Sequence, residues 1–147
     1  MTRIEERRFK AQPAGIGEAV AFVEACCAQG GVARDDALRL ALITEELFTN
    51  TVVHGHGGGA DAVVHIVLRI EAAEILLDYS DEAAPFDPLA RLPDALAPLE
   101  AQPDARRPGG LGVPLVVQLA SRIRYSRVGD RNCLSIALTR AGERLQD

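Results

Sequence analysis

Two polar side chains, Glu46 and Asn50, stand four residues apart in a stretch that contains neither proline nor glycine. The stretch covers residues 35–53 and stops before Gly55, and its apolar residues recur at helical spacing, so we expect one helix. Residues four apart lie on one side of a helix, whereas Glu45 lies about 100° around it. The helix would therefore hold an acid and an amide at a fixed separation.

The chemistry that this pair could perform follows from its side-chain types. The amide oxygen of Asn50 suits Mg²⁺, a hard ion that prefers oxygen ligands and keeps several waters and phosphate oxygens. The carboxylate of Glu46 could take a proton from a hydroxyl group or a water. Two solvated residues on a helix surface are the alternative, and for this pair alone they are the more common case.

A glycine-rich segment later in the chain makes a ligand site more plausible. Gly109, Gly110 and Gly112 precede an apolar run over residues 113–120, which we expect to be a helix with Pro114 in its first turn. Free backbone N–H groups and the positive end of the helix dipole attract phosphate there, and glycines let the backbone approach closely. Taken alone, such a segment is more often a tight turn than a phosphate site.

The connection between Asp81 and Gly109 is long and rich in proline. Connections of this length in a compact domain are usually functional lids or are disordered. Arg106 and Arg107 stand at its far end, where they could reach phosphates or the acidic groups of a partner. A solvated loop is an equally weighted alternative.

The remaining pattern predicts an α+β fold. Periodicity and turn residues indicate one further helix, over 16–29, and strands over 4–10, 62–70, 74–80, 123–128 and 132–139. The strands over 62–70 and 74–80 are expected to form one hairpin, and those over 123–128 and 132–139 a second. The strand over 4–10 is expected at an edge of the sheet. Helices on one face of a mostly antiparallel sheet make a two-layer sandwich. Asp81 would close a strand, and we expect Asn132 to be a turn residue, with a contact near a ligand as the alternative.

Composition limits the class of protein. A length of 147 residues with 48% apolar residues fits a single domain over 1–147. No apolar run approaches the ~20 residues that span a bilayer, and the charged N-terminus lacks a signal-peptide core, so we expect a cytoplasmic protein without a membrane partner. Three cysteines form no paired framework, which fits a reducing compartment. The net charge of −5 argues against nucleic acid and favours a protein partner.

The order of these segments resembles the GHKL superfamily of ATP-binding proteins, which has the Bergerat-type ATP-binding fold and includes histidine-kinase catalytic domains. Within it, the chain is most similar to the small bacterial anti-sigma-factor serine/threonine kinases. Residues 45–55, Glu-Glu-Leu-Phe-Thr-Asn-Thr-Val-Val-His-Gly, look like their first nucleotide box. Residues 81–88 look like the second box, and residues 109–115 look like the third.

The resemblance implies a role for each matching residue. Glu46 would be the general base that activates a substrate serine, Asn50 would help to hold Mg²⁺, and Asp81 would accept a hydrogen bond from the adenine amino group of ATP. The lid and third box would contribute further cofactor-binding residues, namely Arg107, Gly109, Gly110, Leu111 and Gly112. The third box would contact the phosphates and anchor the lid.

The second box departs from the family pattern at two of its cofactor-binding positions. Glycine usually follows the aspartate by two residues, where this chain has Ala83, and a later glycine position is Pro85. Alanine is small enough to permit close approach of adenine but does not favour a positive φ. A shifted or weaker adenine contact is therefore expected.

By this resemblance the chain would be an anti-sigma regulatory factor. It would phosphorylate an anti-anti-sigma protein of the STAS type, bind a sigma factor and form a homodimer, with ATP and Mg²⁺ as cofactors. A non-catalytic nucleotide-binding module of a partner-switching pathway is the alternative. A histidine-kinase catalytic domain ranks last. Only about 34 residues precede the main helix, so nothing upstream is expected to supply the dimerising helices and the phospho-accepting histidine.

Overall fold

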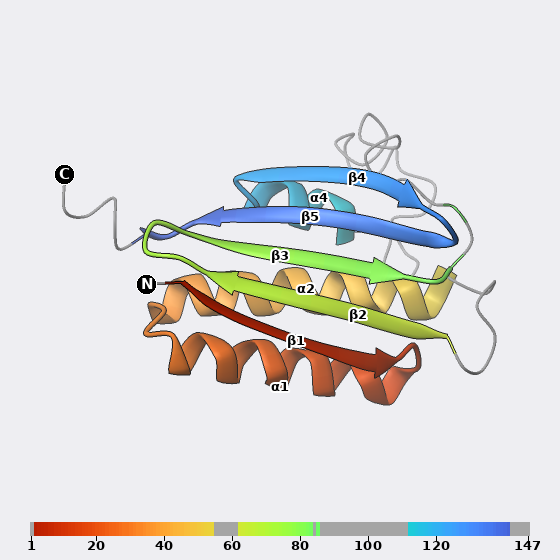
Figure 1. Ribbon diagram of the computed structural model, residues 1–147, viewed down its shortest axis with the longest axis horizontal. Helices are drawn as coiled ribbons and strands as arrows, with labels where there is room; N and C mark the ends of the chain where they lie inside the picture. Colours follow the sequence, from red (N-terminus) through yellow and green to blue (C-terminus); the bar gives the residue numbers. More distant parts are fainter. Residues whose placement is uncertain (1, 55–61, 84, 86–111, 142–147) are drawn as a thin grey trace, which may run out of the picture.

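The computed structural model describes residues 2–54, 62–83, 85 and 112–141. Within these residues, helices and strands follow one another as predicted (Figure 1). In chain order they are β1 (Arg3–Lys10), α1 (Pro13–Gln29), α2 (Arg34–His54), β2 (Val63–Ile70), β3 (Glu74–Asp81), α4 (Gly112–Leu119), β4 (Arg122–Val128) and β5 (Arg131–Thr139).

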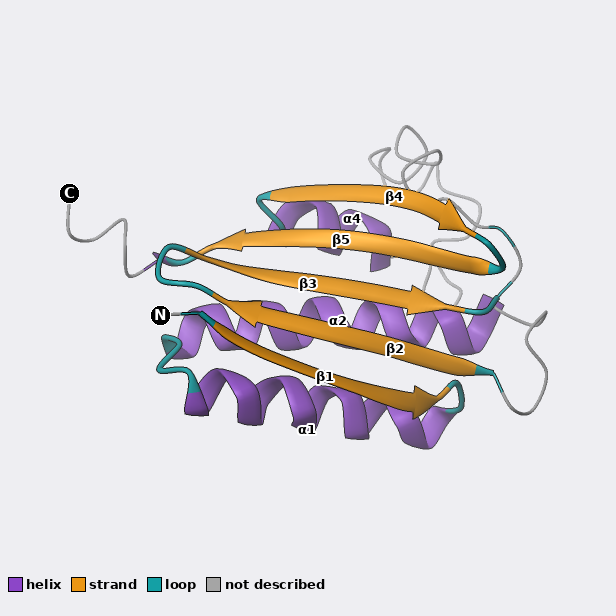
Figure 2. Cartoon of the chain, viewed as in Figure 1, coloured by secondary structure: helices purple, strands orange, loops and turns teal. Residues whose placement is uncertain are grey.

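The strands form one antiparallel sheet in the order β1-β2-β3-β5-β4. The helices lie on one face of this sheet (Figure 2), which confirms the predicted α+β two-layer sandwich. Both hairpins are present, and β1 is an edge strand. The largest difference is at α1, which begins at Pro13 rather than at residue 16, because proline is well tolerated in a first helical turn.

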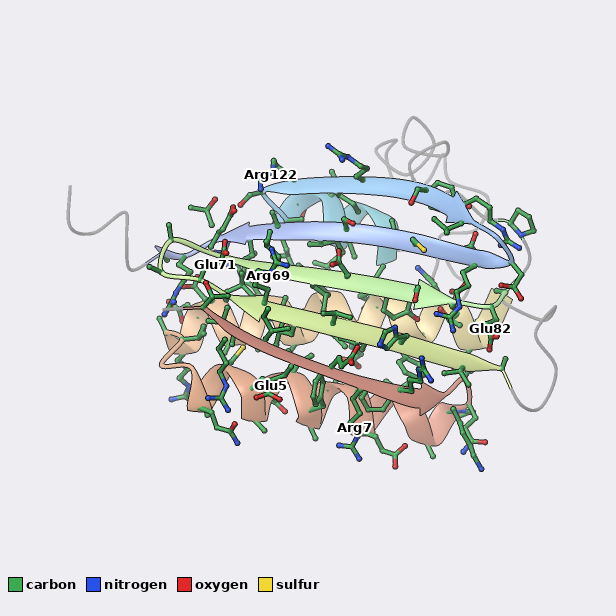
Figure 3. All side chains as sticks on the ribbon, viewed as in Figure 1. Glu5, Arg7, Arg69, Glu71, Glu82 and Arg122 are labelled. Carbon is green, nitrogen blue, oxygen red and sulfur yellow. The ribbon has the colours of Figure 1, made fainter. Side chains whose placement is uncertain are left out.

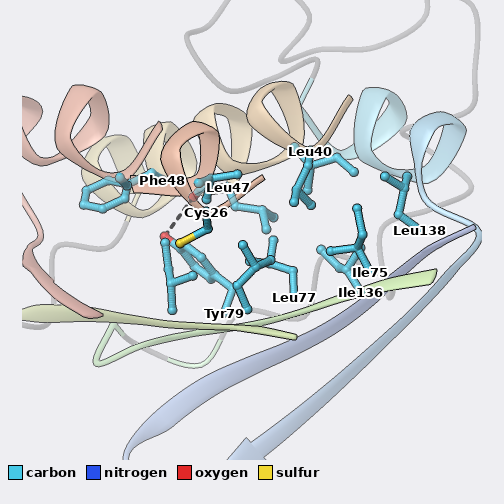
Figure 4. Packing of buried hydrophobic residues seen from close by; sticks show 14 of the residues in the cluster. Cys26, Leu40, Leu47, Phe48, Ile75, Leu77, Tyr79, Ile136 and Leu138 are labelled. Atoms are coloured by element: carbon cyan, nitrogen blue, oxygen red, sulfur yellow. Dashed lines mark hydrogen bonds between the residues drawn. The ribbon is translucent and has the colours of Figure 1, made fainter. Parts of the chain in front are cut away.

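The core lies between the helices and the inner face of the sheet (Figure 4). Residues of β2 alternate between buried and partly exposed positions, as the sequence pattern predicted. The largest fully buried side chains come from both layers and include Leu40, Ile43, Phe48, Ile66, Leu68, Ile75, Leu77, Val116, Ile136 and Leu138. Burial of these apolar groups fixes how α2 and α4 sit on the sheet.

The outer face of the sheet mixes polar and apolar side chains and lies opposite the helices, as antiparallel sheets can leave one face solvated. The strand register places Arg69, Leu76, Ala137 and Arg122 in one row across it. Figure 3 labels Arg69 and Arg122 on their strands, and Arg122 forms an ion pair with Glu74 at 3.2 Å. The continuous apolar core lies on the other face of the sheet, which the helices cover.

The N-terminal end of α2 is fixed to the C-terminal end of β5. The buried carboxylate of Asp36 accepts hydrogen bonds from the Ala141 N–H at 2.9 and 3.2 Å and from the Arg39 guanidinium at 2.9 Å. Arg39 also donates to the carbonyl oxygen of Thr139 at 3.0 Å. These bonds set the position of the helix that carries Glu46 and Asn50.

Candidate functional site

Glu46 and Asn50 both lie on the C-terminal half of α2. Glu46 is partly buried, whereas the adjacent Glu45 is exposed, as expected from their angular separation on the helix. The side-chain oxygen Oδ1 of Asn50 is buried and has no hydrogen-bond partner among the residues that the structure describes. Buried polar atoms are nearly always paired, so this oxygen is well suited to a ligand or a cation.

The local environment also changes the acidity of Glu46. Burial raises the pKa of Glu46, and the nearby charge of Glu45 raises it further. A carboxylate with a raised pKa is a stronger base, which suits proton abstraction from a hydroxyl group.

The last turns of α2 are bonded directly to the end of β3 through Thr51. The hydroxyl group of Thr51 donates to Asp81 Oδ2 at 2.8 Å. The Tyr79 hydroxyl group contacts Thr51 Oγ1 and lies 3.2 Å from the Leu47 carbonyl oxygen, a bond drawn dashed in Figure 4. Burial raises the pKa of Tyr79 well above its usual value, so this hydroxyl group remains a neutral donor. The network brings Asp81 next to the residue that follows Asn50.

The second box turns at Asp81 without an unusual backbone conformation. The Ala83 N–H donates to Asp81 Oδ1 at 3.2 Å, and Ala83 is buried. No non-glycine residue in the described ranges has a positive φ, so alanine fits at position 83 without strain. Pro85 is exposed.

The expectation that Asn132 is a turn residue was wrong. The turn consists of Gly129 and Asp130, where Gly129 has a φ of 61°, and Asn132 is a buried residue of β5. It lies directly opposite Asp81 in the sheet and donates from Nδ2 to Asp81 Oδ1 at 3.0 Å. Spacing along the sequence could not predict this contact, because only the strand register brings Asp81 and Asn132 together.

Thr51 and Tyr79 were also missed as site residues. Both are polar groups on the inner, apolar side of their elements, and both are buried. A buried hydroxyl group needs a partner, so a polar residue at a core position was the available signal.

The third box is only partly described. Gly112 is the first residue of α4, and Val116 of the same helix belongs to the buried core with residues of α2. The end of β3 and the C-terminal end of α2 lie at the same end of the molecule, and α4 leads away from it toward the start of β4 (Figure 1). Arg107, Gly109, Gly110 and Leu111 lie outside the described residues.

A metal at this site would depend on few protein ligands. No group of three or more His, Cys, Asp or Glu side chains within the described ranges could hold a metal ion. The unpaired Asn50 oxygen fits Mg²⁺, which commonly takes one or two protein ligands and completes its shell with water and phosphate.

A family model for the histidine kinase-like ATPase domain matches residues 9–138. The chain belongs to this family. The matched region contains all three boxes, so the resemblance to GHKL proteins is confirmed and the protein has the ATP-binding domain of kinases and ATPases. No significant match exists among curated proteins.

Solved structures agree on the fold. A chain of the SiaB–SiaC complex from Pseudomonas aeruginosa superimposes with a TM-score of 0.58 and 16% identity, covering 93% of this chain and 91% of that one. A blue-light activated histidine kinase from Erythrobacter litoralis gives 0.54 and 16% identity over 90% of this chain, which spans 62% of the kinase chain. The catalytic domain of histidine kinase ThkA gives 0.51 and 10% identity, with coverage of 92% and 98%.

None of the described helices is both long enough and apolar enough to cross a membrane.

Proposed function

We propose that this protein is an ATP-dependent serine/threonine protein kinase that acts as an anti-sigma regulatory factor. It phosphorylates an anti-anti-sigma protein of the STAS type and also binds a sigma factor, as a homodimer located in the cytoplasm. The family assignment supports ATP binding, and the similarity to a chain of the SiaB–SiaC complex supports action within a protein complex.

The unpaired Asn50 oxygen is the observation that carries this proposal. It is buried one helical turn from the partly buried Glu46, and Thr51 joins the same helix to Asp81. An amide oxygen without a partner and a carboxylate with a raised pKa match the needs of a magnesium-dependent phosphoryl transfer. Buried polar atoms are nearly always paired, so this oxygen points to a bound ligand or cation.

Each residue then has a distinct task. Asp81 accepts a hydrogen bond from the adenine amino group, Asn50 offers its oxygen to Mg²⁺, and Glu46 orients or deprotonates the attacking hydroxyl group. Bound Mg²⁺ supplies charge stabilisation for the phosphates, and most of the barrier reduction in such reactions comes from positioning and electrostatics. Ala83 and Pro85 border the adenine pocket, while Arg107, Gly109, Gly110, Leu111 and Gly112 contact the phosphates.

A non-catalytic module is the second candidate. Asp81 already accepts three hydrogen bonds from protein donors, so a nucleotide has less of its carboxylate available. In that case nucleotide binding would only order the lid for a protein partner.

Incubation with radiolabelled ATP and purified STAS-domain proteins of the same organism separates the two candidates. A kinase transfers label to a serine or threonine, whereas the module binds ATP without transfer. Glu46→Ala should keep its affinity for ATP within about threefold and lose transfer by about 100-fold or more, because a general base contributes at least that much.

Glu45→Ala is the matched control, because Glu45 is adjacent in the chain but exposed on another side of α2. We expect this variant to transfer phosphate at the wild-type rate at neutral pH. Wild-type transfer by Glu46→Ala would remove Glu46 as the base, and absence of transfer by the native protein to any partner would favour the module.

A further inference from the structure

The side-chain amide of Asn132 has a fixed orientation. Arg127 Nη1 lies 3.2 Å from Asn132 Oδ1, and a guanidinium group can only donate, so the amide oxygen must face it. The Tyr125 hydroxyl group donates to the same oxygen at 2.7 Å. Two donors on Oδ1 leave the amide N–H groups facing Asp81.

This orientation makes the two oxygens of Asp81 unequal. Oδ1 accepts from Asn132 Nδ2 at 3.0 Å and from the Ala83 N–H at 3.2 Å, whereas Oδ2 accepts from Thr51 at 2.8 Å. Each carboxylate oxygen offers two lone-pair sites. Among the residues that the structure describes, Oδ1 is therefore saturated by donors, and Oδ2, with one donor, keeps capacity for one more.

The same hairpin also holds the backbone after Asp81. Arg127 Nη1 donates to the Ala83 carbonyl oxygen at 2.9 Å, and Asn132 Nδ2 lies 3.5 Å from it. Both β4 and β5 thus contact the second box, although they lie more than 40 residues away in the sequence.

We infer that Asn132, oriented by Tyr125 and Arg127, is a positioning residue that aims Asp81 Oδ2 at the amino group of a bound purine. The inference rests on the proposed nucleotide binding, and it names Asn132 as the residue that determines which purine base is preferred. A site built to accept an N–H group discriminates strongly against an analogue that lacks it. The protein therefore prefers a 6-amino purine nucleotide over a 6-oxo one, and Asn132 sustains that preference.

The test compares ATP with inosine triphosphate (ITP), which differs in carrying an oxo group and an N–H in place of the 6-amino group and ring nitrogen. Affinities of both magnesium complexes are measured by calorimetry, with ITP titrated to millimolar concentrations as a displacer of bound ATP so that weak binding is still measured. Asn132→Ala should lower ATP affinity about tenfold and change ITP affinity less than twofold. The selectivity ratio then falls about tenfold.

Cys133→Ala is the control, because Cys133 is the next residue of β5 and faces the opposite side of the sheet. It should keep the wild-type ratio. Thermal unfolding followed by circular dichroism checks that each variant is folded. If Asn132→Ala does not fold, Tyr125→Phe replaces it. This variant removes the hydroxyl donor to Asn132 Oδ1 and should lower the ratio two- to threefold.

The outcomes separate the inference from the proposed function. A native protein that binds neither nucleotide overturns nucleotide binding itself. If the native protein prefers ATP but folded Asn132→Ala loses ATP and ITP affinity equally, or loses neither, only the role of Asn132 is overturned. A merely structural residue would leave the ATP-to-ITP selectivity ratio unchanged.

Discussion

Glu45 and Glu46 are neighbours in the chain but differ in their surroundings. Glu46 is partly buried, and its pKa is raised above the ordinary value of a glutamate carboxylate, first by burial and second by the charge of Glu45. A general base works only when it is deprotonated. When its pKa is raised, acidification therefore abolishes activity at a higher pH. The pH profile therefore reports on the role of Glu46.

We predict that phosphoryl transfer falls on acidification at a pH above the ordinary pKa of a glutamate carboxylate, because the pKa of Glu46 is raised. Glu45→Gln should move this acidic limb to lower pH without changing the rate at about pH 8, since it removes the second cause of the shift. Single-turnover transfer from about pH 4, near the ordinary glutamate pKa, to about pH 8 measures both profiles. If Glu45→Gln leaves the acidic limb of the pH profile at the wild-type pH, the charge of Glu45 does not raise the pKa of the catalytic base.

The polar residues show the limit of what spacing alone can predict. Glu46 and Asn50 could be paired because a helix relates them locally. Asn132 could not be paired with Asp81, since 51 residues separate them and the register of β3 with β5 decides the contact. The same holds for Thr51 and Tyr79, whose partners lie on another element.

At the scale of elements, alternation and turn residues predicted the strands well. The pattern of β2, with Val64, Ile66 and Leu68 buried on one face, is local and can therefore be predicted from the sequence. The strand order cannot be predicted in the same way. It depends on how the two hairpins pair, with β5 rather than β4 beside β3, and this pairing involves residues far apart in sequence.

The packing of α1 against its neighbours depends on one glycine. A Cβ atom at Gly15 would lie 2.4 Å from the Lys10 carbonyl oxygen and 2.7 Å from the ring of Phe48, whereas one at Gly17 would meet nothing within 4 Å. The first position has no room for a methyl group, and the second is open.

We predict opposite effects of alanine at these two positions. Gly15→Ala should lower the free energy of unfolding by about 1–3 kcal/mol through overpacking. Gly17→Ala should raise it by about 0.5–1 kcal/mol, because alanine is the better helix former. Urea unfolding measures both, and equal stability of the two variants would contradict the packing of α1 on β1 and α2.

At the scale of the whole molecule, the site is held from two sides. Asp36 joins the start of α2 to the end of β5, while Thr51 joins the last turns of α2 to the end of β3. Solved structures with at most 16% identity share this architecture. The fold therefore tolerates wide sequence change, and we propose that the particular polar pairs at one end of the sheet give this chain its chemistry.

Binding of magnesium adenylates tests the central claim most directly. Calorimetric titration of the native protein with ATP and with ADP, each with and without Mg²⁺, should show saturable binding that Mg²⁺ strengthens. Asn50→Ala should remove the strengthening by Mg²⁺, because it removes the only unpaired buried Asn oxygen among the described residues. A folded native protein that binds neither nucleotide, with or without Mg²⁺, would contradict the account.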